Sequence, residues 1–319
     1  MAKQYEARGL LDFQRAFAGE EACWDHLNRI RWPDGFVCPR CGHDKAWFIR
    51  TRKVMDSKTS VTAGTIFHKT RTPLLKWYWL LYRMATNKVG TSVAEMQRLL
   101  DIRDYKTAWL MAHKVRKAMS DRDAHYTPAG LVELDESFFG PAGQTPGRGS
   151  ECKSTVLCAV SLYLDAKGRQ RPGFAHLQVV KDASAKSIEG FLDRLGCGAG
   201  TAEGRQLLET IRTDGWRSYE KAARKKNLAH CRVVLRQPSD TGRLLSWVHR
   251  VISNAKAVLR GTHRGVSEKH LQAYLGEVCY RFNRRFWGKE LFDRLIRACA
   301  STGTVTYSQL LGRKAPVMS

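Results

Sequence analysis

The chain has 319 residues and a net charge of +24, because 54 lysines and arginines outnumber 30 aspartates and glutamates. This charge favours a polyanionic partner such as nucleic acid, while a 43% hydrophobic content excludes a disordered basic tail. The longest apolar stretch, 74–81, contains Lys76, so we predict no membrane-spanning segment. A charged N-terminus without a signal peptide and nine scattered cysteines predict a cytoplasmic protein without disulfides. The length predicts about two domains with a small accessory module.

Residues 1–70 are loop-rich and contain Cys38 and Cys41 in the sequence CPRCGH. Two thiolates at this spacing can hold one tetrahedral zinc ion, but a structural site needs four ligands, normally from a second pair about 15–20 residues further on. No cysteine or histidine lies between Trp47 and Phe67. The residues left to complete a site are His43, Cys23, His26 and His68. We therefore favour a ribbon-like module with less than one tightly held zinc, in which the cysteine pair is a vestige.

Residues 71–125 predict three amphipathic helices, and Ser92 with Glu95 predicts a capped helix start. Their spacing is typical of a helix-turn-helix region that binds DNA. We expect the outward face of the third helix to contact phosphates and base edges through Lys106, His113, Lys114, Arg116 and Lys117. An ordinary solvated basic helix is the alternative, and the net charge favours DNA binding.

Residues 126–300 change to a pattern of strands followed by alternating helices and strands. The predicted strands are 131–139, 154–165, 174–182, 206–215 and 229–236. The predicted helices are 185–195, one from Arg217, 244–259 and 268–284. The order β-β-β-α-β-α-β-α predicts a mixed sheet with helices packed on it, in the α+β or α/β class. Residues 301–319 are expected to form a C-terminal tail.

Two aspartates of this sheet are candidates for metal chemistry. Asp135 lies inside the first strand, on the same face as Glu133 and opposite Glu136, and a carboxylate in that place is costly to bury without a partner. Asp214 lies where the fourth strand ends in a glycine turn. Carboxylates on neighbouring strand ends can hold two divalent cations about 4 Å apart, on either side of a phosphodiester. Taken alone, each aspartate is more often structural than catalytic.

Four segments carry a specific resemblance: ELDESFFG, IRTDGWRSY, WVHRVISNAKAVLRGTHRG and YLGEVCYRFNRR. Together they resemble the DDE transposases of bacterial insertion sequences, and most closely the ISXO-like family numbered fifteen ninety-five, which has a zinc-ribbon N-terminus. The similarity extends over nearly the whole chain, including CPRCG and SVTAGTIFHKTR. The resemblance implies a ribonuclease-H-like catalytic domain in a nucleoid-associated bacterial protein. It also implies binding to terminal inverted repeats and target DNA, followed by metal-dependent strand cleavage and transfer in a homodimer or larger synaptic complex.

Carried over by position, the resemblance assigns the first two acidic metal ligands to Asp135 and Asp214. The third acidic position of the family falls on His249, and its basic partner, which contacts the DNA backbone, falls on Lys256 about two helical turns further on. Some branches of the family carry His or Asn at the third position. Imidazole is a poorer ligand for Mg²⁺ than carboxylate and suits Mn²⁺ better. Acidic residues that could assist are Glu151, Glu209 and Glu277. The alternative for His249 is a neutral helix-face histidine bonded to a backbone group.

Two features of the sequence keep other functions open. The family's second cysteine pair aligns with Arg52 and Met55, and His249 is not acidic, so a catalytically silent DNA-binding protein derived from a transposase is the main alternative. A ribonuclease-H-like nuclease or junction resolvase is the second. The glycine-rich loop GPAGQTPGRG lacks the phosphate-binding pattern GxxxxGK[ST], so we expect no nucleotide cofactor.

Overall fold

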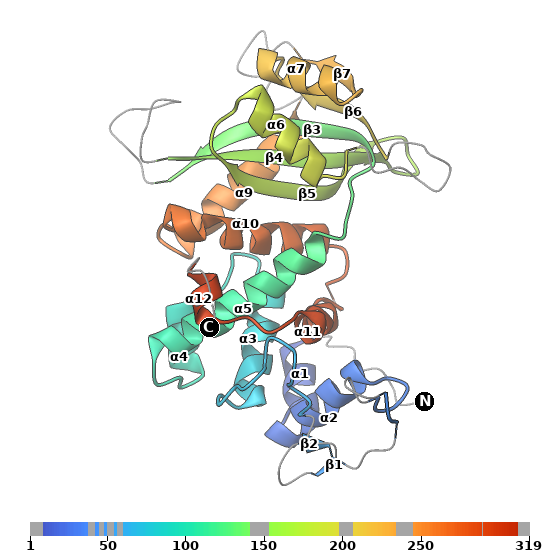
Figure 1. Cartoon of the computed structure of the whole chain (residues 1–319). Helices are drawn as coiled ribbons and strands as arrows, with labels where there is room; N and C mark the ends of the chain where they lie inside the picture. The colour runs from blue at the N-terminus through green and yellow to red at the C-terminus, as the bar shows by residue number, and fades with distance from the viewer. Residues whose placement is uncertain are drawn as a thin grey trace, which may run out of the picture. The chain divides into compact units, whose positions relative to one another are not determined.

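The computed structural model describes residues 9–37, 42–44, 48–49, 54–55, 60–140, 153–197, 207–233, 245–288 and 290–311. The chain divides into two compact units, shown in Figure 1. The helical unit comprises Met1–Arg122 and Arg284–Ser319, and the sheet unit comprises Asp123–Asn283. Within the described ranges, no helix has both the length and the apolar character needed to cross a membrane.

The helical unit contains a short two-stranded ribbon and a set of packed helices. Its elements are α1 (Leu10–Ala16), α2 (Glu20–Arg31), β1 (Phe48–Ile49), β2 (Val54–Met55), α3 (Leu74–Thr86), α4 (Val93–Leu99), α5 (Tyr105–Asp123), α11 (Leu291–Ser301) and α12 (Tyr307–Leu310). The three helices predicted in the 71–125 region are present as α3, α4 and α5. The predicted cap is confirmed, because the Ser92 side chain accepts a hydrogen bond from the Glu95 amide. The helix-turn-helix interpretation of these helices stays a prediction.

Aromatic rings form the core of the helical unit. The Phe292 ring of α11 lies with its centroid 5.2 Å from that of Phe13, 5.5 Å from that of Phe17 and 5.6 Å from that of Tyr78. These contacts join α11 to α1 and α3, and rings at such separations pack favourably. The sequence analysis placed residues 291–300 in the catalytic domain, whereas the structure groups them with the N-terminal helices because their apolar face packs there.

The sheet unit is built on five strands in the order β5-β4-β3-β6-β7. The strands are β3 (Gly130–Phe139), β4 (Ser154–Leu164), β5 (Gln170–Val180), β6 (Leu208–Thr213) and β7 (Ala229–Arg232). β3, β4 and β5 pair antiparallel, whereas β6 runs parallel to β3 and β7 parallel to β6. The helices are α6 (Ala185–Arg194), α7 (Arg217–Lys225), α9 (Ser246–Gly261) and α10 (Glu268–Asn283). The predicted mixed sheet with packed helices is confirmed.

Side-chain alternation along β4 gives the sheet an apolar core on each face. Val156, Cys158 and Val160 are buried against α9 and α10. Leu157 and Ala159 point the other way and are buried against α6 and α7. Helices therefore cover both faces of the sheet, as Figure 1 shows. This explains why β4 is an almost continuous apolar run in the sequence.

One buried carboxylate joins the central strand to helix α9. Glu133 of β3, whose side chain is only 2% exposed, accepts hydrogen bonds from the backbone amides of Trp247 and Val248, both at 3.0 Å. Helix α9 has Leu245 at its N-cap and no side-chain cap of its own. Glu133 therefore acts as the missing cap, although it lies more than 100 residues away in the sequence.

We predict that Glu133→Ala lowers the free energy of unfolding of the sheet unit by about 1–3 kcal/mol, because two buried amides lose their acceptor. Glu133→Gln keeps an acceptor oxygen and should cost less. Urea unfolding, monitored by circular dichroism, measures both. The matched control is Glu209→Ala, an exposed residue of β6 that should change stability by less than about 0.5 kcal/mol. Equal effects of Glu133→Ala and Glu209→Ala would refute the capping role.

Candidate active site

Asp135 lies in the middle of β3, in the centre of the sheet, and its side chain is 13% exposed. Its pKa is raised to about 8, first by burial and then by the negative charges of Glu136 and Asp214. The positive charge of Lys256 acts in the opposite direction. Asp135 is therefore a carboxyl group whose ionisation needs a compensating positive charge.

His249 faces this carboxyl group from helix α9. Its Nδ1 lies 3.6 Å from Oδ2 of Asp135. Burial lowers the pKa of His249, with the charge of Asp214 acting against this shift, so the ring is neutral at pH 7. Its Nε2 is buried and has no hydrogen-bond partner among the described residues. The ring thus offers an unused nitrogen beside a carboxyl group, and Nε2 does not make the backbone hydrogen bond that the alternative interpretation required.

Asp214 follows β6 in a tightly constrained turn. Its Oδ1 accepts a hydrogen bond from the Trp216 amide at 3.1 Å. Gly215 has a φ of 88°, a backbone conformation that residues with a side chain rarely adopt, so glycine is favoured there. Thr213, which is fully buried, accepts a hydrogen bond from the Gly215 amide and pairs with His230 at 2.9 Å. These contacts hold the Asp214 carboxylate in a position from which its negative charge raises the pKa of Asp135 and acts against the lowering of the His249 pKa.

Lys256 completes the set of residues that the sequence analysis selected. Its pKa is lowered by burial first and by repulsion from Arg260 second, and the charge of Asp135 acts against both. Asp135 therefore lies within electrostatic reach of Asp214 and Lys256, and His249 lies within reach of Asp214 and 3.6 Å from Asp135, although these residues come from a strand, a turn and a helix. The structure brings all four predicted residues into one neighbourhood.

Asp135, Asp214 and His249 do not form a closed ligand set for a cation. In the described part of the chain, no three His, Cys, Asp or Glu side chains are grouped closely enough to hold an ion. A bound cation would nevertheless offset the repulsion of Asp135 by Glu136 and Asp214. It would also give a partner to Nε2 of His249, which has none among the described residues. Two carboxylates with one imidazole suit Mg²⁺ less well than Mn²⁺.

Sequence reasoning missed what the neighbouring acidic residues do. Glu133 caps α9, and Glu136 accepts a hydrogen bond from the Tyr219 hydroxyl at 2.6 Å on the other face of the sheet. The apolar Leu245 at the N-cap of α9 was the one available signal for a distant cap. Among the residues suggested as assistants, Glu277 is buried and lies 3.9 Å from Arg281, and Glu209 is exposed on β6. Glu151 lies outside the described residues.

The predicted basic face of α5 is wrong for three of its five residues. His113, Lys114 and Arg116 are 2%, 9% and 0% exposed. The Lys114 ammonium donates to the Ile66 carbonyl at 3.1 Å, and the His113 ring packs on Trp109. Residues 111–116 are all buried, which is more than one helical turn, so this stretch of α5 is enclosed rather than amphipathic.

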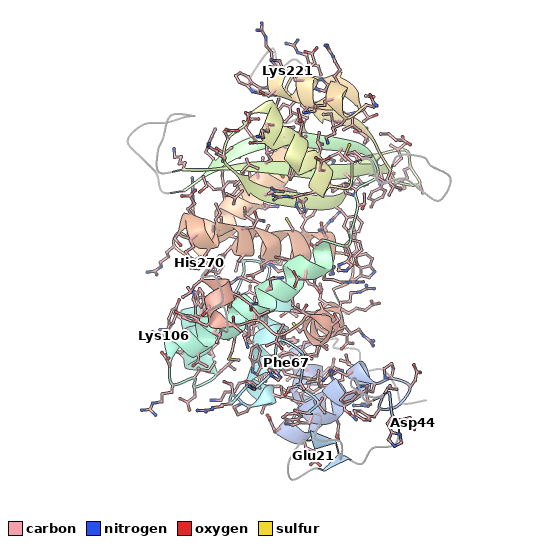
Figure 2. The ribbon with its side chains drawn as sticks, viewed as in Figure 1. Glu21, Asp44, Phe67, Lys106, Lys221 and His270 are labelled. Carbon is pink, nitrogen blue, oxygen red and sulfur yellow. The ribbon has the colours of Figure 1, made fainter. Side chains whose placement is uncertain are left out.

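Two residues of that predicted face are exposed. Lys106 lies at the surface of the helical unit (Figure 2), and Lys117 is exposed and pairs with Asp121 one turn further along α5. Of the five residues predicted to form the basic face of α5, only Lys106 and Lys117 are exposed and therefore accessible to a phosphate.

The zinc prediction rests on Cys38 and Cys41, which lie outside the described residues. Two of the other suggested ligands are engaged in the helical core. Cys23 is fully buried, and burial raises its pKa to about 12. His26 is hydrogen-bonded through Nδ1 to the Tyr78 hydroxyl at 3.1 Å. Zinc binding by the N-terminal region therefore stays an open prediction, with His43 and His68 as the remaining candidates.

Two family models match this chain. The ISXO2-like transposase domain matches residues 128–283, and the transposase zinc-ribbon domain matches residues 18–56. Together they cover more than half of the chain. The chain belongs to the ISXO2-like transposases. The resemblance inferred from the sequence is thereby confirmed, and the larger match contains Asp135, Asp214, His249 and Lys256.

Comparisons with individual proteins add little to this assignment. A search of curated proteins found no match. Among solved structures, the chain is similar to one described as the crystal structure of a pre-cleavage Mos1 transpososome, with 12% sequence identity and a TM-score of 0.29. That similarity covers 72% of this chain and 79% of the other. At this TM-score it carries no argument about the present protein.

We predict that the affinity of the sheet unit for Mn²⁺ rises about tenfold per pH unit between pH 6 and 8 and then levels off. The reason is that Asp135, with a pKa of about 8, must lose a proton before it binds a cation. Burial lowers the pKa of His249, so its own proton loss contributes at the acid end of this range rather than near pH 8. Calorimetric titration with Mn²⁺ at several pH values measures the effect. An affinity that does not change with pH, or an equal pH dependence in Asp135→Asn, would contradict it.

Proposed function

We propose that this protein binds the terminal inverted repeats of an insertion sequence and catalyses DNA strand cleavage and strand transfer. The observation that carries the proposal is the approach of His249 to the buried carboxyl group of Asp135, at 3.6 Å, within reach of the Asp214 charge. Membership of a transposase family supports it. The strand and helix order β-β-β-α-β-α-β-α supports a ribonuclease-H-like fold for the catalytic core.

In this proposal Asp135 and Asp214 hold two divalent cations, Mg²⁺ or Mn²⁺, with His249 as the third ligand. Bound cations supply charge stabilisation at the scissile phosphate and lower the pKa of the attacking water. Lys256, half-buried and not ion-paired in the described part of the chain, holds the DNA backbone near these residues. The raised pKa of Asp135 shows how strongly the site disfavours its own negative charge without a cation.

The partner in this proposal is double-stranded DNA, both as terminal repeats and as target. The net charge of +24 supports electrostatic binding to phosphates. Lys106 and Lys117 are the exposed residues of the predicted helix-turn-helix region that suit this contact. Because two element ends must be joined in one reaction, a homodimer or larger synaptic complex follows from the proposed chemistry.

A catalytically silent DNA-binding protein is the second candidate. Two observations favour it: His249 stands where the family has an acidic residue, and the described residues hold no closed set of metal ligands. Such a protein would bind the same repeats without cutting them, so one cleavage assay separates the two functions.

We predict that Asp135→Asn and Asp214→Asn each lower cleavage of repeat-end DNA by at least about 100-fold, because each removes a charged metal ligand. The substrate is a labelled duplex with the inverted repeats that flank the protein's own gene, and binding is measured by mobility shift in EDTA. Binding should be unchanged. Asp193→Asn, at an exposed position of α6, is the matched control. No cleavage by the unaltered protein with either Mg²⁺ or Mn²⁺ would favour the silent DNA-binding protein.

We predict that His249→Glu retains or raises cleavage with Mg²⁺, because a carboxylate is a better ligand for this ion than imidazole. His249→Gln has a similar size without the charge and should lower cleavage with both ions. The ratio of Mg²⁺-dependent to Mn²⁺-dependent rates is the measurement. Complete loss of cleavage by His249→Glu with both ions would show that the imidazole has a different role, such as proton transfer.

A further inference from the structure

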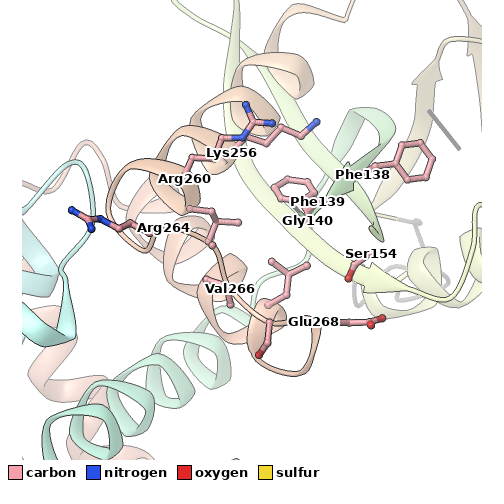
Figure 3. Close-up of a pocket in the computed structure, with 13 residues that line it drawn as sticks. Phe138, Phe139, Gly140, Ser154, Lys256, Arg260, Arg264, Val266 and Glu268 are labelled. Atoms are coloured by element: carbon pink, nitrogen blue, oxygen red, sulfur yellow. The ribbon is translucent and has the colours of Figure 1, made fainter. Parts of the chain in front are cut away.

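The sheet unit contains a cavity of about 730 Å³ beside the candidate active site. It lies between the end of β3 and helix α9, and Figure 3 shows Phe139 at its centre with Lys256 and Arg260 along one edge. We call it the β3–α9 pocket. Its apolar lining includes the buried side chains of Phe139, Leu259 and Leu271. A volume of this order is typical of ligand pockets rather than of packing defects.

The pocket lining carries three cations, Lys256, Arg260 and Arg264, and one carboxylate, Glu268. Lys256 lies over the Phe139 ring, with Nζ 5.4 Å from the ring centroid, and Arg260 follows one turn later on α9. Arg264 lies at the rim. Within the described residues, none of these three cations has an ion pair or a hydrogen bond. Lys256 and Arg260 repel each other beside an apolar hollow, and such a surface suits a phosphate-bearing ligand with a flat apolar part.

The two elements that line the pocket, β3 and α9, also carry the candidate catalytic residues Asp135 and His249. Asp135 and Phe139 lie on the same face of β3, about 13 Å apart along the strand. His249, Lys256 and Arg260 follow one another along α9, with about 16 Å between the first and the last. A DNA strand held at Asp135 therefore reaches the pocket within a few nucleotides.

We propose that the β3–α9 pocket binds unpaired nucleotides of the DNA strand that is cut, close to the scissile phosphate. Lys256 and Arg260 bind the phosphate, and a base packs against Phe139 and the neighbouring apolar side chains. A volume of about 730 Å³ is the size of a small-ligand pocket, so it holds unpaired nucleotides rather than a double helix. The ligand is therefore single-stranded. This inference rests on the proposed function, because it places the substrate of that site.

The test measures DNA binding without cleavage, in EDTA, with the full chain. One probe is the blunt terminal-repeat duplex, and the other is the same duplex with a short unpaired tail that carries 2-aminopurine. Fluorescence anisotropy gives both affinities, and 2-aminopurine fluorescence reports whether the unpaired base is packed. The variants are Arg260→Gln, which removes a pocket cation, and Ser267→Trp, which obstructs the pocket from an exposed position. Arg250→Gln, exposed on the same helix outside the pocket, is the matched control.

We expect the unaltered protein to bind the tailed duplex about tenfold more tightly than the blunt one, since each packed base adds appreciable affinity. Arg260→Gln and Ser267→Trp should remove this preference and the fluorescence change, whereas Arg250→Gln should keep both. The pocket assignment is overturned if the unaltered protein has no preference, or if Arg260→Gln weakens both probes equally. Neither result bears on the proposed function, whose failure appears separately as no cleavage of repeat-end DNA by the unaltered protein with either Mg²⁺ or Mn²⁺.

Discussion

The arrangement of the candidate active site depends on the hydrogen bonds that Glu133 accepts from the first turn of helix α9. Glu133 and Asp135 lie on one face of β3, and His249 lies just beyond the two capped amides. The cap therefore fixes the start of α9 against the strand that carries Asp135, and His249 follows within one turn at 3.6 Å from that carboxyl group. Burial raises the pKa of Glu133, whereas the hydrogen bonds from the Trp247 and Val248 amides and the charge of Arg212 lower it. The amides that Glu133 caps therefore also favour its ionised form, which accepts their hydrogen bonds.

The same physical solution recurs where other elements meet. Glu20 of α2 accepts hydrogen bonds from the amides of Leu74 and Leu75, both at 2.8 Å, and so caps α3 within the helical unit. In the sheet unit, Asn283 of α10 receives the Ala175 amide at 2.7 Å and donates to the Ala175 carbonyl. β5 is an edge strand, and such contacts satisfy backbone groups that would otherwise pair with another chain. Polar side chains distant in sequence thus join one helix to another and a helix to a strand, and their hydrogen bonds fix the relative position of elements that apolar packing alone would leave free to shift.

Local patterns were sufficient to predict the strands and helices of the sheet unit, because alternation and helical periodicity report directly on which faces are buried. The family spacing selected Asp135, Asp214, His249 and Lys256, and their role as a metal site stays a prediction. The prediction of an exposed basic face on α5 was wrong because residues 111–116 are all buried. The sequence does not distinguish a buried lysine that donates to a carbonyl, as Lys114 does, from an exposed lysine. The role of Glu133 was missed because its partners are backbone amides of a distant segment, which carry no sequence signal.

The electrostatics of the site give a reason for a histidine at the third position. Asp135 already has Glu136 and Asp214 as negative neighbours, and together with burial they raise its pKa to about 8. A carboxylate at position 249 would add a further negative charge close to Asp135, because the His249 ring already lies 3.6 Å from that carboxyl group, and like charges at short range repel strongly unless a cation intervenes. Neutral His249 removes that repulsion in the absence of a cation while keeping a nitrogen available through Nε2. The exchange weakens the attraction for hard cations such as Mg²⁺, because an oxygen ligand and one unit of charge are lost. Under the proposed function, the cations Lys256 and Arg260 then contribute more to the attraction of the DNA phosphates, because bound metal contributes less positive charge.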